Sequence, residues 1–215
     1  MRIHYMRITV RRFLSALAAL GLVCACSCVG VRSDIVLNAD GTGRMSLEYR
    51  VSRQFEAVGA LDGNAGRPAV PVGRADFERS IARLEGLELV SFSSREEGRD
   101  LVSRAVISFS RLEDVLPLLD YQGAALYREG ENRVLRLNLG AGREDTDPRL
   151  AALLEEACRG YEIALSLSAP GGAALRVKGD REGLGIGESG KRAEFSAALS
   201  RFFRPGGDLE LEFVF

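Results

Sequence analysis

Several residue types that carry enzyme chemistry are scarce or absent in this 215-residue sequence. It has no tryptophan, and its single histidine is His4, which lies in a segment that we interpret below as a removable leader. Without that leader no imidazole remains. We therefore expect neither Ser-His-Asp or Cys-His activation of a nucleophile nor zinc held by histidine. Enzymes that work with paired carboxylates stay open on composition alone.

The chain also lacks a large excess of positive or negative charge. Lysine and arginine total 29 residues against 30 aspartates and glutamates, and only Lys178 and Lys191 are lysines. A near-neutral chain gives no electrostatic reason to expect nucleic acid as a partner. The hydrophobic share of 46% and the charged share of 27% are typical of a folded globular protein, and the length predicts one compact domain.

The first part of the chain has the pattern of a bacterial export signal. Four arginines come before an uncharged run over 13–23, which has the length of a signal-peptide core, and no acidic residue comes before Asp34. Met6 is a second possible start, because the arginines after it would still supply the basic region. The four arginines are Arg2, Arg7, Arg11 and Arg12.

Three cysteines follow this run directly, at Cys24, Cys26 and Cys28. The sequence Val23-Cys24-Ala25-Cys26 resembles the bacterial lipobox, which has an apolar residue three positions before a cysteine and a small residue just before it. That resemblance implies that the cysteine thiol receives a diacylglyceryl group and that the cysteine becomes the new amino terminus. Cys26 is the first candidate for lipidation and Cys28, preceded by Ser27, is the second. The spacing differs from that of zinc ribbons, and we expect no metal site.

Two other interpretations of the leader stay open. The uncharged stretch over 13–31 is just long enough to cross a bilayer uncleaved, and a plain cleaved signal peptide would export the chain without a lipid. Small residues near the end of the stretch favour cleavage. We therefore divide the chain into a signal peptide with lipobox (1–25), an anchor or linker (26–33) and a single domain (34–215).

A lipid on Cys26 would decide where the protein resides. Two fatty chains hold a protein on a membrane for practical purposes permanently, whereas one chain binds reversibly. The cysteine outside the leader, Cys158, lies in an apolar pattern and is expected to be a small core residue. We do not expect it to form a disulfide bond with Cys28.

Apolar residues alternate with polar ones in many short segments, which is the period of half-buried strands. The turn Asp40-Gly41-Thr42-Gly43 predicts a β-hairpin over 31–52, because Asp and Gly supply the backbone conformations that a hairpin turn requires. Glycines and prolines predict a loop over 62–73. Further strands are predicted at 87–93, 100–109, 124–128, 133–139, 161–168 and 209–215.

Three short helices are predicted between these strands. Asp76 can cap the first, over 76–86; Ser110 and Glu113 match a capping box for the second, over 110–119; Pro148 fits the first turn of the third, over 147–160. An opening hairpin followed by three helix-then-hairpin units predicts an α+β fold. The expected form is an antiparallel sheet built of β-hairpins, with about three short helices on one face.

One segment is similar to a nucleotide-binding motif. Gly185 to Lys191 matches the phosphate loop until Arg192, which stands where Ser or Thr must bind magnesium. The residues that follow, 193–199, alternate like a strand, whereas the motif requires a helix there. We interpret the segment as a flexible glycine-rich loop and expect no nucleotide.

The whole pattern resembles the LppM-like lipoproteins. The features that carry the resemblance are the lipobox leader, the hairpin around Asp40-Gly41-Thr42-Gly43, the α+β segments and a strand that ends in Ser168-Ala169-Pro170-Gly171. The resemblance covers roughly residue 31 to the end. It implies an extracytoplasmic binding or envelope module and supplies no catalytic residues.

The function expected from the sequence is that of a lipoprotein anchored outside the cytoplasm, on the inner or outer membrane of a bacterium. We expect its domain to work by binding an envelope protein or a lipid-like molecule, with no cofactor and no catalysis. A carboxylate-dependent envelope hydrolase and a purely structural envelope component are the alternatives.

Overall fold

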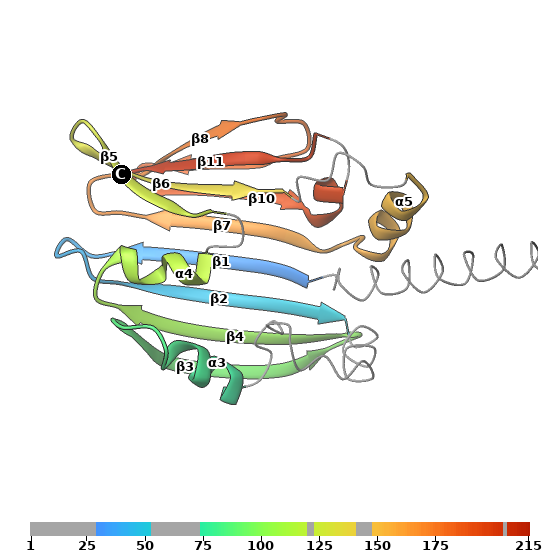
Figure 1. Ribbon diagram of the computed structural model, residues 1–215, viewed down its shortest axis with the longest axis horizontal. Helices are drawn as coiled ribbons and strands as arrows, with labels where there is room; N and C mark the ends of the chain where they lie inside the picture. Colours follow the sequence, from blue (N-terminus) through green and yellow to red (C-terminus); the bar gives the residue numbers. More distant parts are fainter. Residues whose placement is uncertain (1–28, 53–73, 120–122, 141–147, 204–205) are drawn as a thin grey trace, which may run out of the picture.

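The computed structural model describes residues 29–52, 74–119, 123–140, 148–203 and 206–215 (Figure 1). The leader with its three cysteines and the loop predicted over 62–73 lie outside these residues. The strands are β1 (Val29–Leu37), β2 (Gly43–Ser52), β3 (Leu87–Glu97), β4 (Asp100–Phe109), β5 (Ala125–Glu129), β6 (Asn132–Leu139), β7 (Glu162–Ser168), β8 (Ala174–Lys178), β9 (Gly185–Ser189), β10 (Arg192–Ala198) and β11 (Leu209–Val214). The helices are α3 (Arg74–Ile81), α4 (Leu116–Leu119) and α5 (Pro148–Ala157), with 3-10 turns η1 (Leu112–Val115) and η2 (Leu199–Phe203).

The larger sheet has seven strands in the order β3-β4-β2-β1-β7-β10-β9. Its centre is the β1–β2 hairpin, in which Ile35 pairs with Met45 and Leu37 with Gly43. This hairpin confirms the prediction made from the Asp-Gly turn. β1 begins at Val29, so residues 29–33, which were assigned to the linker, belong to the sheet.

One strand pair in this sheet departs from the prediction of an antiparallel sheet. β1 and β7 run parallel, with Val31 opposite Ile163 and Val36 opposite Ser168. All other strand pairs in the described residues are antiparallel. The alternation of polar and apolar residues along a strand does not show whether the strand runs parallel or antiparallel to its neighbour. β1 and β7 are also far apart in the sequence, so no short turn between them indicates their direction.

The remaining strands form a second, four-stranded sheet in the order β5-β6-β11-β8. The single predicted sheet is therefore two. The third predicted helix-then-hairpin unit does not form, because β8 follows β7 but pairs with β11 in the other sheet. β8 and β9 were not predicted as strands, since glycines around them obscure the alternation.

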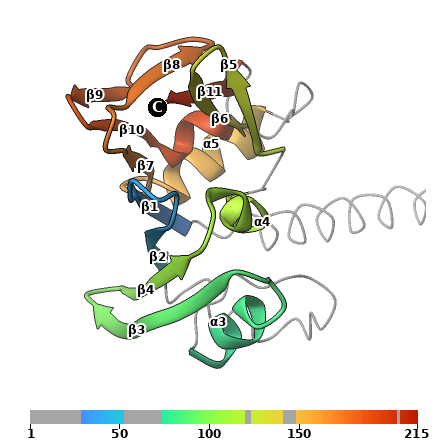
Figure 2. The same ribbon diagram turned by 90° about the vertical axis from the view of Figure 1, so that its left-hand side faces the viewer.

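The core lies between the two sheets. One face of the larger sheet buries Ile35, Met45, Ile107 and Phe195 against the inner face of the smaller sheet, which contributes Leu211 and its neighbours. The three helices are on the same side of the larger sheet as the smaller sheet (Figure 2). The α+β class is confirmed.

The helices are short, as predicted. Phe77 and Ile81 of α3 enter the core, and the ring of Phe77 lies 5.9 Å from that of Tyr49 and 5.3 Å from that of Phe92. The capping box is one residue further along than predicted. The Arg111 amide donates to Asp114 at 3.0 Å, so Asp114 rather than Glu113 closes the turn before η1.

Candidate functional site

A cleft of about 390 Å³ opens where three turns meet at one end of the molecule. The turns are the β1–β2 hairpin turn, the start of η1 and the β5–β6 hairpin, all near the carboxyl terminus (Figure 1). Residues that line the cleft include three arginines and two carboxylates. They are Arg111, Arg128, Arg133, Asp40 and Glu113, with Gly41, Ser110, Leu126 and Tyr127.

Two of these arginines are held by neighbours. Arg133 donates to Glu113 at 2.9 Å, and its guanidinium lies 5.6 Å from the centre of the Phe215 ring. Arg111 donates to Asp114 at 3.0 Å. Arg128 is exposed and makes no ion pair with the part of the chain that the structure describes. Its cationic group is therefore available to a ligand.

The hairpin turn on the other side of the cleft is fixed by its own hydrogen bonds. The hydroxyl of Thr42 donates to Asp40 at 2.7 Å, and the Thr42 amide donates to the same carboxylate oxygen at 3.0 Å. These bonds lower the pKa of Asp40, the hydroxyl bond having the larger effect. Asp40 is therefore a structural carboxylate of the turn, ionised at neutral pH, and the cleft is a polar surface with more positive than negative groups.

Tyr127, which lines the cleft, is hydrogen-bonded to a buried carboxylate on the outer face of the smaller sheet. Glu212 of β11 is only 5% exposed, although its neighbours along the strand, Leu211 and Phe213, point into the core. It accepts hydrogen bonds from the Tyr127 hydroxyl at 2.8 Å and from Lys178 at 3.0 Å. The glutamate therefore ties together three strands, β5, β8 and β11.

The hydrogen bonds from Lys178 and Tyr127 keep Glu212 charged. The Lys178 hydrogen bond, followed by that of Tyr127, lowers the pKa of Glu212 below its usual value. The same contact with Glu212 raises the pKa of Tyr127. A general acid requires a raised carboxyl pKa, so Glu212 has the opposite perturbation.

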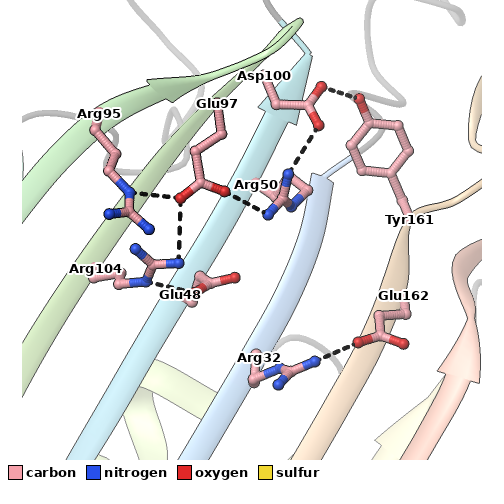
Figure 3. Close-up of polar contacts among 9 residues, drawn as sticks. All are labelled: Arg32, Glu48, Arg50, Arg95, Glu97, Asp100, Arg104, Tyr161 and Glu162. Carbon is pink, nitrogen blue, oxygen red and sulfur yellow. Dashed lines mark hydrogen bonds and ion pairs between the residues drawn. The ribbon is translucent and has the colours of Figure 1, made fainter.

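The outer face of the larger sheet holds a second set of ion pairs, shown in Figure 3. Arg104 donates to Glu48 at 2.6 Å, and Arg50 donates to Glu97 at 2.9 Å. Hydrogen bonding from Arg95 lowers the pKa of Glu97. Each drawn charge has a partner on the same or a neighbouring strand, which is how cross-strand pairs stabilise an exposed sheet face.

This set of ion pairs ends in a buried hydrogen bond. The Tyr161 hydroxyl donates to Asp100 at 2.7 Å, and the other Asp100 oxygen lies 3.3 Å from Arg50 (Figure 3). Burial first, and the bond to Asp100 second, raise the pKa of Tyr161. The ring of Tyr161 also lies beside β1, since a Cβ on Gly30 would be in ordinary van der Waals contact with it at 3.5 Å.

The residues selected from the sequence have different outcomes. Both lipidation candidates, Cys26 and Cys28, lie outside the described residues, and their lipidation stays a prediction. The glycine-rich segment forms β9 and its turn into β10, which pairs back antiparallel on β9. No helix follows it, so the strand-loop-helix of a phosphate loop is not formed.

Cys158 is the clearest correction. It is buried as expected, at 1% exposure, but it is disulfide-bonded rather than a free core thiol. No pattern in the sequence shows what lies near the end of α5. The residues that line the cleft were not predicted from the sequence, and neither was the burial of Glu212. A strand in which Leu and Glu alternate predicts that its glutamates face solvent.

Among the described residues, every helix is too short or too polar to span a bilayer. No group of three or more histidine, cysteine, aspartate or glutamate side chains among them is arranged to hold a metal ion.

No protein family model matches the sequence, and no curated protein matches it. The fold is similar to the NMR structure of the folded domain of LppM from Mycobacterium tuberculosis. The two chains share 14% sequence identity with a TM-score of 0.47, and the likeness covers 87% of this chain and 89% of that one.

Proposed function

We propose that this protein is a bacterial lipoprotein held outside the cytoplasm by a diacylglyceryl group on Cys26, and that its α+β domain works by binding. The observation that carries the proposal is the leader. A basic start, an uncharged core and a Val-Cys-Ala-Cys sequence occur in the order that lipoprotein export requires.

The short connection between anchor and domain supports this arrangement. Only Ser27 and Cys28 separate Cys26 from the first residue of β1, Val29. An extended chain spans at most about 3.3–3.6 Å per residue, so the start of β1 would lie within about 10 Å of the lipidated residue. The domain would rest against the membrane surface rather than reach out on a long tether.

The position of the cleft then indicates the side from which a ligand arrives. The cleft includes the turn after Leu37, at the end of β1 that is opposite to Val29 (Figure 1). A strand rises about 3.3 Å per residue, which places the cleft roughly 25 Å further from the anchor. We therefore propose that the cleft faces the aqueous envelope and binds a partner that presents a carboxylate or a phosphate to Arg128.

Binding rather than catalysis is supported by the state of the buried carboxylate. Glu212 is ionised and paired with Lys178, and the cleft carboxylates Asp40 and Glu113 each have a hydrogen-bond partner. Arginine is well suited to carboxylates and phosphates because its planar group offers two parallel donors.

The anchoring proposal is tested by replacing each candidate cysteine. Cells that express the full chain are labelled with radioactive palmitate and then separated into soluble and membrane fractions. Cys26→Ser should abolish labelling, because the variant has no thiol at position 26 to be lipidated. Cys28→Ser, the matched control two residues away, should be labelled as strongly as the unchanged protein. Labelling that is lost in Cys28→Ser and kept in Cys26→Ser would contradict the proposal.

A further inference from the structure

β5 is an outermost strand of the smaller sheet, and it lies beside the cleft (Figure 2). Three consecutive residues of this strand, Leu126, Tyr127 and Arg128, line the cleft. Successive side chains of a strand point to opposite faces of the sheet, so a cleft that touches all three runs along the edge of the strand. The backbone of β5, on its edge away from β6, therefore forms part of the cleft wall.

The hydrogen bonds of β6 show which backbone groups of β5 point to this edge. The Arg133 amide donates to the main-chain oxygen of Phe215 at 2.7 Å, and the Phe215 amide donates to the Arg133 carbonyl at 2.9 Å. Both polar backbone groups of Arg133 are thus directed away from β5. Arg133 lies opposite Arg128 in the register of β5 and β6, so the two form a non-hydrogen-bonded pair of the antiparallel ladder. The amide and carbonyl of Arg128 therefore point to the outer edge, and those of Leu126, two residues earlier, do the same.

These four backbone groups of Leu126 and Arg128 make no hydrogen bond within the part of the chain that the structure describes. The opposite edge of the same sheet differs, because the Leu175 amide of β8 donates to the Glu188 carboxylate at 2.7 Å. Unpaired groups along a strand edge are a template for an added strand, and proteins usually cover them or place charges beside them. In β5 these groups open into the cleft.

The side chains on the cleft face of β5 add a requirement of charge. Leu126 packs against the core, and alternation places Arg128 on the same face. Arg128 is exposed and has no ion-pair partner among the described residues, whereas Arg133 on the next strand is paired with Glu113 at 2.9 Å. A strand added to β5 would place one side chain opposite Arg128. A carboxylate there would complete a cross-strand pair of opposite charges.

We propose that the cleft binds an extended peptide segment of an envelope protein, which pairs antiparallel with β5 as a fifth strand of the smaller sheet. Antiparallel pairing lets one peptide residue use both backbone groups of Arg128, and the next but one those of Leu126. The peptide sequence is then acidic-x-apolar, with the acidic residue opposite Arg128. The inference rests on the proposed function, because it specifies the partner that presents a carboxylate to Arg128, and it adds recognition of the peptide backbone.

The size and charge of the cleft favour this ligand. Its volume of about 390 Å³ is at the lower end of the range for ligand sites, about 300–1,000 Å³, and suits a short segment. A second copy of this chain fits less well, because β5 presents Leu126 and Arg128 on this face and no acidic residue to pair with the arginine.

Peptide binding to the isotope-labelled full chain in detergent micelles, followed by NMR titration, tests the inference. The probe is a capped Thr-Glu-Val-Leu-Thr peptide, whose Glu is designed to lie opposite Arg128. N-methylation of the Glu amide removes its bond to the Arg128 carbonyl and should weaken binding about five- to tenfold. N-methylation of the Val amide, which points away from β5, is the matched control and should leave the affinity unchanged. Arg128→Gln should weaken binding about threefold.

Amide hydrogen exchange in the same samples gives a second measurement. The peptide should slow exchange of the Leu126 and Arg128 amides, which point to the outer edge. It should leave exchange of the Tyr127 amide unchanged, because that amide is directed toward β6. Unchanged exchange at Leu126 and Arg128 in the peptide complex would overturn the added strand.

The inference and the proposed function fail separately. Equal affinity for the unmodified peptide and the N-methyl-Glu peptide would show that the cleft recognises the carboxylate alone, which overturns the added strand and keeps the proposed function. Inorganic phosphate that binds through Arg128 while the peptide does not bind has the same meaning. If neither binds, both proposals are refuted. Self-association that protects the Leu126 and Arg128 amides without peptide would identify a second copy as the ligand and overturn the inference.

Discussion

Glu212 offers the sharpest test of how the smaller sheet is held together. We consider Glu212→Gln, which keeps the shape of the side chain and removes its charge. The Tyr127 hydroxyl, 2.8 Å from Glu212, can still donate to the glutamine oxygen. The bond from Lys178 at 3.0 Å loses the attraction between opposite charges, because only the lysine ammonium remains charged. A hydrogen bond to a buried charged group contributes about 1.5–3 kcal/mol and a neutral one about 1 kcal/mol. The difference between the two is about 0.5–2 kcal/mol. Because Lys178 is largely exposed, we expect a loss of about 1 kcal/mol or somewhat less in the free energy of unfolding.

The matched control is Glu210→Gln on the same strand. Glu210 contacts the same Lys178, at 2.5 Å, but its side chain is more exposed than that of Glu212, 27% against 6%. Surface pairs contribute little, so the loss should stay below about 0.5 kcal/mol. Urea denaturation of a soluble Cys26→Ser chain, followed by circular dichroism, measures both variants. Equal losses for the two substitutions would refute the claim that burial makes Glu212 the important partner.

The difference between Glu212 and its glutamine variant should also depend on pH. The folded-state pKa of Glu212 lies below its ordinary value of 4.5, so the folded state favours the ionised form. The stabilisation is fully present above the unfolded-state pKa and is lost as the pH falls through the folded-state pKa. The two stability curves should therefore be separated near pH 7 and should converge below pH 4.5. A gap that widens on acidification would contradict the direction of the shift.

Three further outcomes are expected. A disulfide typically contributes about 2–4 kcal/mol to stability, so a reductant should lower the urea midpoint of the unchanged protein and leave that of Cys158→Ser unaltered. A shift in both would show that the bond of Cys158 is not the one that the reductant breaks. Tyr161→Phe removes the buried bond to Asp100 at 2.7 Å and should cost about 1–2 kcal/mol in unfolding free energy, whereas no loss would mean that the hydroxyl contributes nothing. Arg128→Gln should weaken the binding of inorganic phosphate, which is measured by NMR of the arginine Nε resonances. The control is Arg44→Gln, since Arg44 is exposed but does not line the cleft, and this variant should bind phosphate as the unchanged protein does. Equal phosphate binding by the two variants would exclude Arg128 from the site.

Local patterns in the sequence predicted the elements well. The Asp40-Gly41 turn fixed the first hairpin, and clean alternation located β7 and β11, because turn chemistry and period-two patterns act over a few residues. The α+β class followed from those elements. Glycine-rich stretches hid β9, in which the side chains that would reveal alternation are missing.

Contacts between residues that are far apart in the sequence could not be predicted from these local patterns. The parallel pairing of β1 with β7 is independent of the alternation in either strand. Burial of Glu212 depends on Tyr127 and Lys178, which come from two other strands. The cleft likewise combines turns from three separate parts of the chain, so no single segment of the sequence predicts it.

Intact mass of the protein taken directly from membranes is the most direct test of the central claim, that a lipid on Cys26 anchors a binding domain. The account predicts a chain that lacks residues 1–25 and carries a diacylglyceryl group at its new amino terminus. A chain recovered from the cytosol that still contains His4 and carries no fatty acid would contradict it.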